Sequence, residues 1–264
     1  MKKQLPLYWK PRTRREFLRQ AASAGTFFAG SAVLYPFIGK PKSALAGQRF
    51  YVYRGSEAAL ITFRIDPNRL RKTVPEVFTP NNRGILIAWF AFERKVEPKA
   101  MAHNYHKAIL AIPVVFEGQS GFGSRGRRVE GFFIEQAYLN AGVSYAKRNY
   151  GYPLERAKID WSADKSSIKS TVAKDGTQIA HIALSLSDSE AEPQPGRDVA
   201  HLNLQQNGLT PKPTMTKTRE EERIRLPGQV VEANLFGIED YEVIDAVYRK
   251  YDWFLAPHSE ALAE

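Results

Sequence analysis

Between residues 58 and 186 the sequence alternates short apolar, β-branched runs with clusters of Gly, Pro, Asn and Asp. Runs of this length and composition, bounded by turn-forming residues, are typical of β-strands. Because many strand patterns and few helical patterns share one chain, the sequence predicts a mainly β (α+β) domain, an antiparallel sandwich or barrel. The expected strands are Ala58–Ile65, Ile85–Phe92, Ala108–Phe116, Gly131–Leu139, Ile168–Val172 and Ile179–Leu186.

A few short helices are also expected. Residues Pro67–Val74 follow Asp66, a good N-cap, and begin with Pro at the first turn. Residues 141–150 form a second candidate helix. The polar or charged stretches are predicted to be loops, and an aromatic-rich stretch near the end is predicted to be a strand or a helix: Asp188–Arg197, Leu209–Glu222 and Val243–Leu255.

The first 46 residues form a candidate export signal. Thr13–Arg19 resembles the twin-arginine signal pattern, and a mildly apolar stretch and an Ala-x-Ala cleavage site at Ala44–Ala46 follow it. The alternatives are a transmembrane anchor, which needs about 20 strongly apolar residues, and an uncleaved signal. We expect a signal peptide over residues 1–46 and a mature domain over residues 47–264. This domain would be exported to the periplasm or beyond through the twin-arginine translocase, without stable membrane insertion after cleavage.

Charge and cysteine content narrow the functional classes. Residues 1–46 hold nine Lys or Arg and one Glu, a formal charge of +8 out of +10 for the whole chain, so the mature part carries about +2. A nucleic-acid-binding domain needs a basic face on the folded part, and we therefore expect no nucleic-acid partner. The chain has no Cys, which excludes disulfides, thiolate metal sites and cysteine nucleophiles.

Two motifs have the residue spacing of a known binding site but not its structural context. Gly121–Gly126 matches G-x-G-x-x-G, but the residues after it have a strand pattern, whereas dinucleotide binding needs a helix there. His103 and His106 would lie on opposite faces of a strand, and no carboxylate lies close by in sequence to complete a metal site. No nucleophile elbow is present either. The sequence thus predicts no metal and no cofactor.

Three ordered segments, which together span most of residues 58–186, resemble the acetoacetate decarboxylase superfamily. They contain a strand ending in Arg and Asp with a short helix ending in Val-Pro-Glu, a Tyr-containing strand with an Ile-Pro-Val run, and a Tyr-Leu pair followed by an aromatic-Pro pair. The resemblance implies a curved antiparallel β-barrel with a central cavity, usually oligomerised, so a homo-oligomer is expected. The matching residues are Phe63–Asp66 and Leu70–Glu76, Tyr105–Lys107 and Ala111–Phe116, and Tyr138–Leu139, Lys147–Arg148 and Gly151–Pro153.

The departures from the family pattern fall on its chemistry. In the family, the Schiff-base lysine and a second lysine follow the aromatic-Pro pair, where this chain has Leu154 and Glu155. The family's pocket glutamate is replaced by Lys107. A lysine imine supplies the electron sink for decarboxylation of a β-keto acid, and its amine must be partly neutral to form. Leucine cannot form an imine, so the family's usual decarboxylation is not expected.

The first hypothesis is therefore a binding protein. The cavity that the resemblance implies would hold a small organic ligand, keto-acid-like or apolar, without turning it over. The residues that the matched segments bring to it are candidates for substrate or ligand contact: Tyr105, Arg148, Tyr152, Leu154 and Glu155.

The alternative is a decarboxylase-like lyase with a relocated lysine. Lys107 shares one side of its expected strand with Tyr105, Ile109 and Ala111, and a nearby Lys147 or Arg148 would lower its pKa. Lys107 would then be the catalytic residue, acting on a keto acid or aldehyde. Otherwise Lys107 is solvated or pairs with a carboxylate such as Glu93 or Glu155. The exchange of charge at positions 107 and 155 favours a buried Lys107–Glu155 pair.

Overall fold

The computed structural model describes residues 51–94, 96–97, 104–118, 128–141, 150–205, 212–256 and 260–262. This part of the chain is mainly β, as predicted. Its elements are β1 (Tyr51–Arg64), α2 (Pro67–Thr73), β2 (Phe78–Pro80), β3 (Ile85–Glu93), β4 (Val96–Glu97), β5 (Tyr105–Glu117), β6 (Arg128–Leu139), β7 (Leu154–Arg156), β8 (Lys158–Ala163), β9 (Ser167–Lys174), β10 (Thr177–Leu186), β11 (Arg197–Gln205), β12 (Lys212–Asn234), β13 (Glu242–Leu255) and β14 (Glu260–Ala261).

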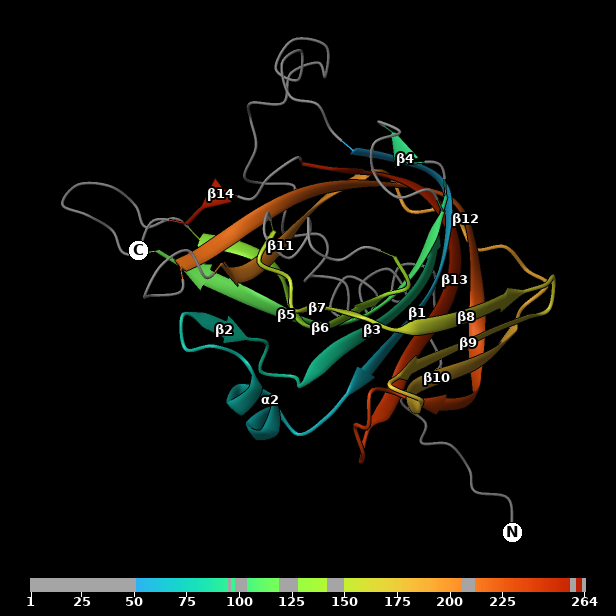
Figure 1. The fold of residues 1–264 in the computed structure, drawn as a ribbon, viewed down its shortest axis with the longest axis horizontal. Helices are drawn as coiled ribbons and strands as arrows, with labels where there is room; N and C mark the ends of the chain where they lie inside the picture. Colours follow the sequence, from blue (N-terminus) through green and yellow to red (C-terminus); the bar gives the residue numbers. More distant parts are fainter. Residues whose placement is uncertain are drawn as a thin grey trace, which may run out of the picture. The chain divides into compact units, whose positions relative to one another are not determined.

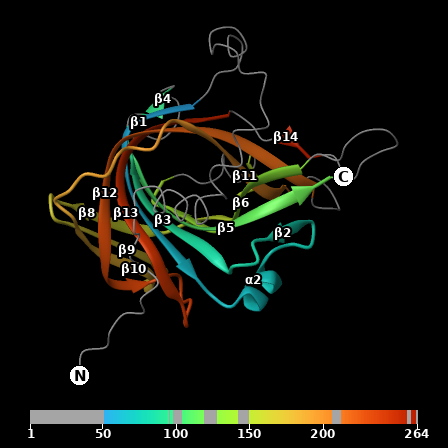
Figure 2. The ribbon, with the colours of Figure 1, turned by 180° about the vertical axis from the view of Figure 1, so that it is seen from behind.

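The strands form one curved sheet in the order β11-β6-β5-β3-β1-β13-β12-β10-β9-β8. Strand β11 pairs with β6 at one end of this order and also with β12. The seven strands from β11 to β12 in this order are therefore joined end to end by pairing. All the pairings along this order are antiparallel except β11–β6. Figures 1 and 2 show β12, β13, β1, β3 and β5 curving around a common centre, with β8, β9 and β10 beside them. The predicted curved antiparallel architecture is confirmed.

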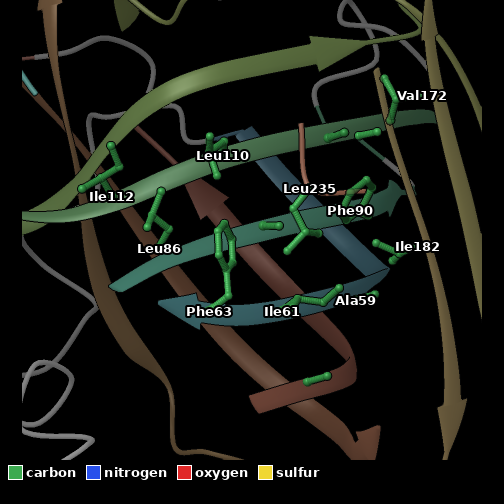
Figure 3. Close-up of a cluster of buried hydrophobic side chains, with 14 of the residues drawn as sticks. Ala59, Ile61, Phe63, Leu86, Phe90, Leu110, Ile112, Val172, Ile182 and Leu235 are labelled. Atoms are coloured by element: carbon green, nitrogen blue, oxygen red, sulfur yellow. The ribbon is translucent and has the colours of Figure 1, made fainter. Parts of the chain in front are cut away.

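The outer face of the curved sheet is covered by α2, β9 and β10. Side chains of β1, β3 and β5 contact those of α2, β9 and β10 in one large apolar cluster, part of which is drawn in Figure 3. The labelled members are Ala59, Ile61, Phe63, Leu86, Phe90, Leu110, Ile112, Val172, Ile182 and Leu235. Successive residues of a strand face opposite sides, so the residues between these belong to the inner face, where the second cluster lies.

Local sequence signals explain several elements. Helix α2 is capped by Asp66, whose carboxylate accepts a hydrogen bond from the Asn68 amide at 2.9 Å, and it begins with Pro, as predicted. The final predicted segment is the strand β13. Nearly all of the second candidate helix, residues 141–150, lies outside the described residues, as do Gly121–Gly126 and His103. In the described part, no helix is long and apolar enough to cross a membrane.

The prediction of a loop over Leu209–Glu222 is wrong. From Lys212 onward this stretch belongs to β12, a strand of 23 residues. Thr214, Thr216, Thr218 and Glu220 are buried on the inner face; between them lie Met215, which is buried in the outer cluster, and the exposed Lys217 and Arg219. The stretch is hydrophilic on both sides because the inner face is itself polar here, so the usual apolar signal of a strand is missing.

Candidate functional site

Lys107 is buried on the inner face. Strand β5 directs Lys107, Ile109 and Ala111 to this side, whereas Ala108 and Leu110 belong to the outer cluster. The Lys107 ammonium lies 2.5 Å from a carboxylate oxygen of Glu93, and their side chains are 4% and 0% exposed. An ammonium and a carboxylate this deeply buried depend on each other for compensation.

The surroundings of the pair stabilise both charges. Glu93 also accepts hydrogen bonds from the Tyr251 hydroxyl at 3.0 Å and from the Trp253 indole at 2.8 Å. The Lys107 nitrogen lies 4.0 Å from the ring centre of Trp89 and 4.1 Å from that of Trp253. Burial lowers the pKa of Lys107, while Glu93 opposes this shift. Aromatic faces and a carboxylate both favour the charged ammonium.

A second buried ion pair lies on β12 and β13. Arg249 donates two hydrogen bonds to Glu220, at 2.6 and 3.1 Å, in the bidentate geometry that favours guanidinium–carboxylate recognition. Arg197 approaches the same carboxylate at 3.3 Å. Burial would raise the pKa of Glu220, but Arg249 and Arg197 outweigh it and hold this pKa well below its usual range. Two cations therefore already hold this carboxylate.

A neutral hydrogen-bonded pair joins Tyr152 to β11. The Tyr152 hydroxyl lies 2.7 Å from Nδ1 of His201. Gly151, with φ of 67°, turns the chain so that the rings of Tyr150 and Tyr152 stack at 5.5 Å, a backbone region that favours glycine. Burial lowers the pKa of His201 to about 4 and raises that of Tyr152. The contact therefore joins a protonated phenol to a neutral imidazole, and the other ring nitrogen, Nε2, is not used in it.

Asn203 lies two residues after His201 on β11, on the same inner face. Its side chain is 1% exposed, yet neither Nδ2 nor Oδ1 has a hydrogen-bond partner among the described residues. The indole nitrogen of Trp89 and Nε of Arg249 are likewise buried without a partner in that part of the chain. Buried polar atoms in native proteins are nearly always paired, so this wall has unused hydrogen-bonding capacity.

The candidate residues fall into three groups. Lys107 and Leu154 have buried side chains on the inner face. Tyr105 and Tyr152 are partly buried and pack against the same cluster, and the Tyr105 ring lies 6.1 Å from that of Tyr53. Burial raises the pKa of Tyr105 well above its usual value. Arg148 lies outside the described residues.

Glu155 does not share a site with Lys107, so the hypothesis of a buried Lys107–Glu155 pair is wrong. Strand β7 alternates like any other, and because Leu154 faces inward, Glu155 faces outward. Its side chain is 45% exposed and forms an ion pair with Lys174. Of the two carboxylates considered as partners of Lys107, Glu93 is the one in contact.

Sequence reasoning missed most of the inner wall. Trp89, His201, Asn203, Glu220 and Arg249 were not candidates. A usable signal was present at Thr214, Thr216 and Thr218, where uncharged Thr occupies every second position and Lys217 and Arg219 follow in alternation with it. This is the period of a strand with a polar inner face. Within the described ranges, no group of three or more His, Cys, Asp or Glu side chains is placed to hold a metal ion.

Comparison with known proteins identifies the family. The family model for acetoacetate decarboxylase matches residues 35–215, more than half of the chain. The chain belongs to the acetoacetate decarboxylase family. No match to a curated protein is found.

Several solved structures share the fold. The acetoacetate decarboxylase of Legionella pneumophila is 14% identical, with a TM-score of 0.64 over 82% of this chain and 88% of its own. The enduracididine biosynthesis enzyme MppR, complexed with a condensation product of pyruvate, is 15% identical, with a TM-score of 0.63 over 84% and 92%. An acetoacetate decarboxylase-like enzyme from Sphingomonas wittichii RW1 is 16% identical, with a TM-score of 0.58 over 86% and 98%. At these identities the likeness extends to the fold alone.

Proposed function

We propose that this family member is an exported protein that binds a small organic ligand, keto-acid-like or apolar, on the inner face of its curved sheet, without Schiff-base decarboxylation. The observation that carries the proposal is Leu154. It follows the aromatic-Pro pair Tyr152-Pro153, where the family resemblance places the imine-forming lysine. Its side chain is 4% exposed and packs in the inner cluster. An aliphatic side chain at this position contributes contact surface and no nucleophile.

Lys107 is the alternative nucleophile, and its contacts favour a binding role over catalysis. An imine forms from the neutral amine, so a catalytic lysine must lose its proton near neutral pH. Burial favours that loss, and the pKa of Lys107 is lowered. However, Glu93 at 2.5 Å and two indole faces stabilise the ammonium. Decarboxylase-like chemistry on a keto acid or aldehyde through Lys107 remains the second candidate, because this buried lysine faces inward.

A relative offers a guide to ligand class. MppR has been solved in complex with pyruvate, and small oxo acids therefore belong in the first panel tested. The inner face of this chain adds aromatic side chains from several strands, including Tyr53, Trp89 and Trp253, which suit a ligand with apolar surface.

A native mass spectrum of the protein purified from its own periplasm tests ligand binding. We expect a population heavier than the polypeptide by the mass of one small organic molecule, released when the protein is denatured. The control is the same protein refolded from denaturant, which should lack the added mass and regain it on addition of the extracted molecule. A ligand-free spectrum, together with no binding from a panel of oxo acids and apolar compounds, would contradict the proposal.

Export is proposed to depend on Arg14 and Arg15, the pair that distinguishes a twin-arginine signal from a general secretory one. We expect the double replacement of both residues by Lys to leave full-length precursor in the cytoplasm, as measured by fractionation and immunoblotting. Replacing Lys2 and Lys3 by Gln, which removes two charges outside the Thr13–Arg19 pattern, is the control and should be exported. Normal export of the Arg14→Lys, Arg15→Lys variant would overturn the assignment.

A further inference from the structure

The buried cations of the inner face, as far as the structure describes it, already have carboxylate partners. Lys107 is paired with Glu93, and Arg249 is paired with Glu220. Arg249 also lies 3.7 Å from Glu222. A ligand carboxylate that approached either cation would have to displace a buried glutamate or lie beside it, and both cost free energy because like charges repel strongly where water is excluded. The charge balance of the described residues thus disfavours an anionic ligand.

Apart from Nε of Arg249, whose guanidinium is already paired with Glu220, the unused groups of this face in the described residues are neutral. Asn203 offers both a donor, Nδ2, and an acceptor, Oδ1, and neither has a partner among the described residues. Two residues earlier, His201 contacts the Tyr152 hydroxyl through Nδ1 at 2.7 Å, and its Nε2 takes no part in this contact. Residues two apart on a strand lie on the same face, which places the His201 and Asn203 side chains side by side on β11.

We propose that His201 and Asn203 recognise an uncharged ligand bearing a carboxamide, the group whose donor and acceptor complement the free amide of Asn203. This inference rests on the proposed function and narrows its ligand class. An amide carbonyl accepts from Asn203 Nδ2, its N–H donates to Asn203 Oδ1, and Nε2 of His201 beside them offers a donor or an acceptor according to its tautomer. A carboxylate of the same shape lacks the N–H donor and adds a negative charge near Glu220.

The chain offers a matched control for Asn203. Asn81 is also buried, at 6% exposure, but its side chain is fully used: Nδ2 donates to the Ile85 carbonyl at 2.9 Å, and Oδ1 accepts from the Ile85 and Arg83 amides at 3.0 and 3.1 Å. Asn81→Leu removes the side-chain hydrogen bonds to backbone groups of Arg83, Ile85 and Pro113, whereas Asn203→Leu removes none among the described residues. Replacing an unpaired buried amide with an apolar group of similar shape is close to neutral.

The experiment has a stability arm and a binding arm. In the ligand-free protein, Asn81→Leu is expected to lower Tm by about 5 °C or more, while Asn203→Leu leaves Tm at or above that of the wild type. In ligand-observed NMR with two isosteric pairs, pyruvamide with pyruvate and benzamide with benzoate, we expect at least one amide to bind at least tenfold more tightly than its carboxylate. Asn203→Leu should weaken the binding of that amide at least tenfold and leave the affinity for the carboxylate unchanged.

The outcomes distinguish failure of the amide site from failure of the proposed ligand-binding function. If the carboxylates bind as well as the amides, or if Asn203→Leu binds the amide as the wild type does, the amide site is wrong while a binding function stands. If Asn203→Leu loses as much Tm as Asn81→Leu, the Asn203 amide has structural partners in solution and the inference is overturned. If none of the four probes binds and the native mass spectrum shows no retained molecule, the proposed function fails and this inference fails with it.

Discussion

Lys107→Met and Glu93→Gln are each expected to lower the free energy of unfolding by about 3–5 kcal/mol, because each leaves an uncompensated charge or an unpaired group in a buried site. The two side chains are almost wholly buried and 2.5 Å apart. The double variant should recover much of the loss, since it removes both charges together. Denaturant unfolding of the four proteins in this cycle measures the coupling directly.

The exposed Lys174–Glu155 pair provides the matched control. These side chains are 39% and 45% exposed, and exposed ion pairs contribute little to stability. The cycle of Lys174→Met and Glu155→Gln should therefore show no clear coupling under the same conditions. If the effects of Lys107→Met and Glu93→Gln simply add, the two residues do not form one buried pair, and the description of the inner face is wrong.

The second large effect is expected in acid. Burial keeps His201 neutral in the folded protein, with a pKa of about 4, while an unfolded chain binds this proton near pH 6.5. Between these values the unfolded state binds more protons, so stability rises with pH and is lost as pH falls. Between pH 7.5 and pH 4, this difference in proton binding lowers the free energy of unfolding by about 3 kcal/mol.

Urea unfolding at several pH values tests this contribution. His201→Gln keeps an acceptor for the Tyr152 hydroxyl but cannot titrate, so its stability should fall less steeply than that of the wild type between about pH 6.5 and 4. His181→Gln, which removes an imidazole whose carboxylate partner, Glu232, is 70% exposed, is the control for the loss of a histidine. Parallel profiles for the wild type and His201→Gln would mean that His201 titrates freely and does not lie in a buried neutral pair.

Where the strands are amphipathic or wholly apolar, the sequence predicted the fold well. The runs that became β1, β3, β5 and β10 carry residues that are buried on the outer face, so their composition reports their structure. The helix α2 was predictable because capping chemistry is local. Strand β12 was not predicted, because its inner residues are Thr and Glu rather than Val and Ile, and only the alternation of Thr with charged residues over Thr216–Arg219 indicates a strand.

The candidate site was only partly predictable for a related reason. Strand parity placed Lys107 with Ile109 and Ala111, and the structure has them on one face. The same alternation excludes Glu155 from the inner face, because its neighbour Leu154 faces inward. This step required the structure of β7. The Arg249–Glu220 and Tyr152–His201 contacts join residues 29 and 49 positions apart. Such contacts depend on strand order, and one sequence does not contain that information.

The central claim is that this inner face binds its ligand without forming an imine. Incubation with pyruvate, reduction with sodium borohydride and measurement of the intact mass test it most directly, because reduction makes any imine permanent. Leu154→Lys restores an amine at the position where the family resemblance places it and is the positive control, expected to gain the mass of one reduced adduct. We predict that the wild type gains none. A reduced adduct on the wild type that maps to Lys107 and disappears in Lys107→Met would contradict the account and assign catalysis to the relocated lysine.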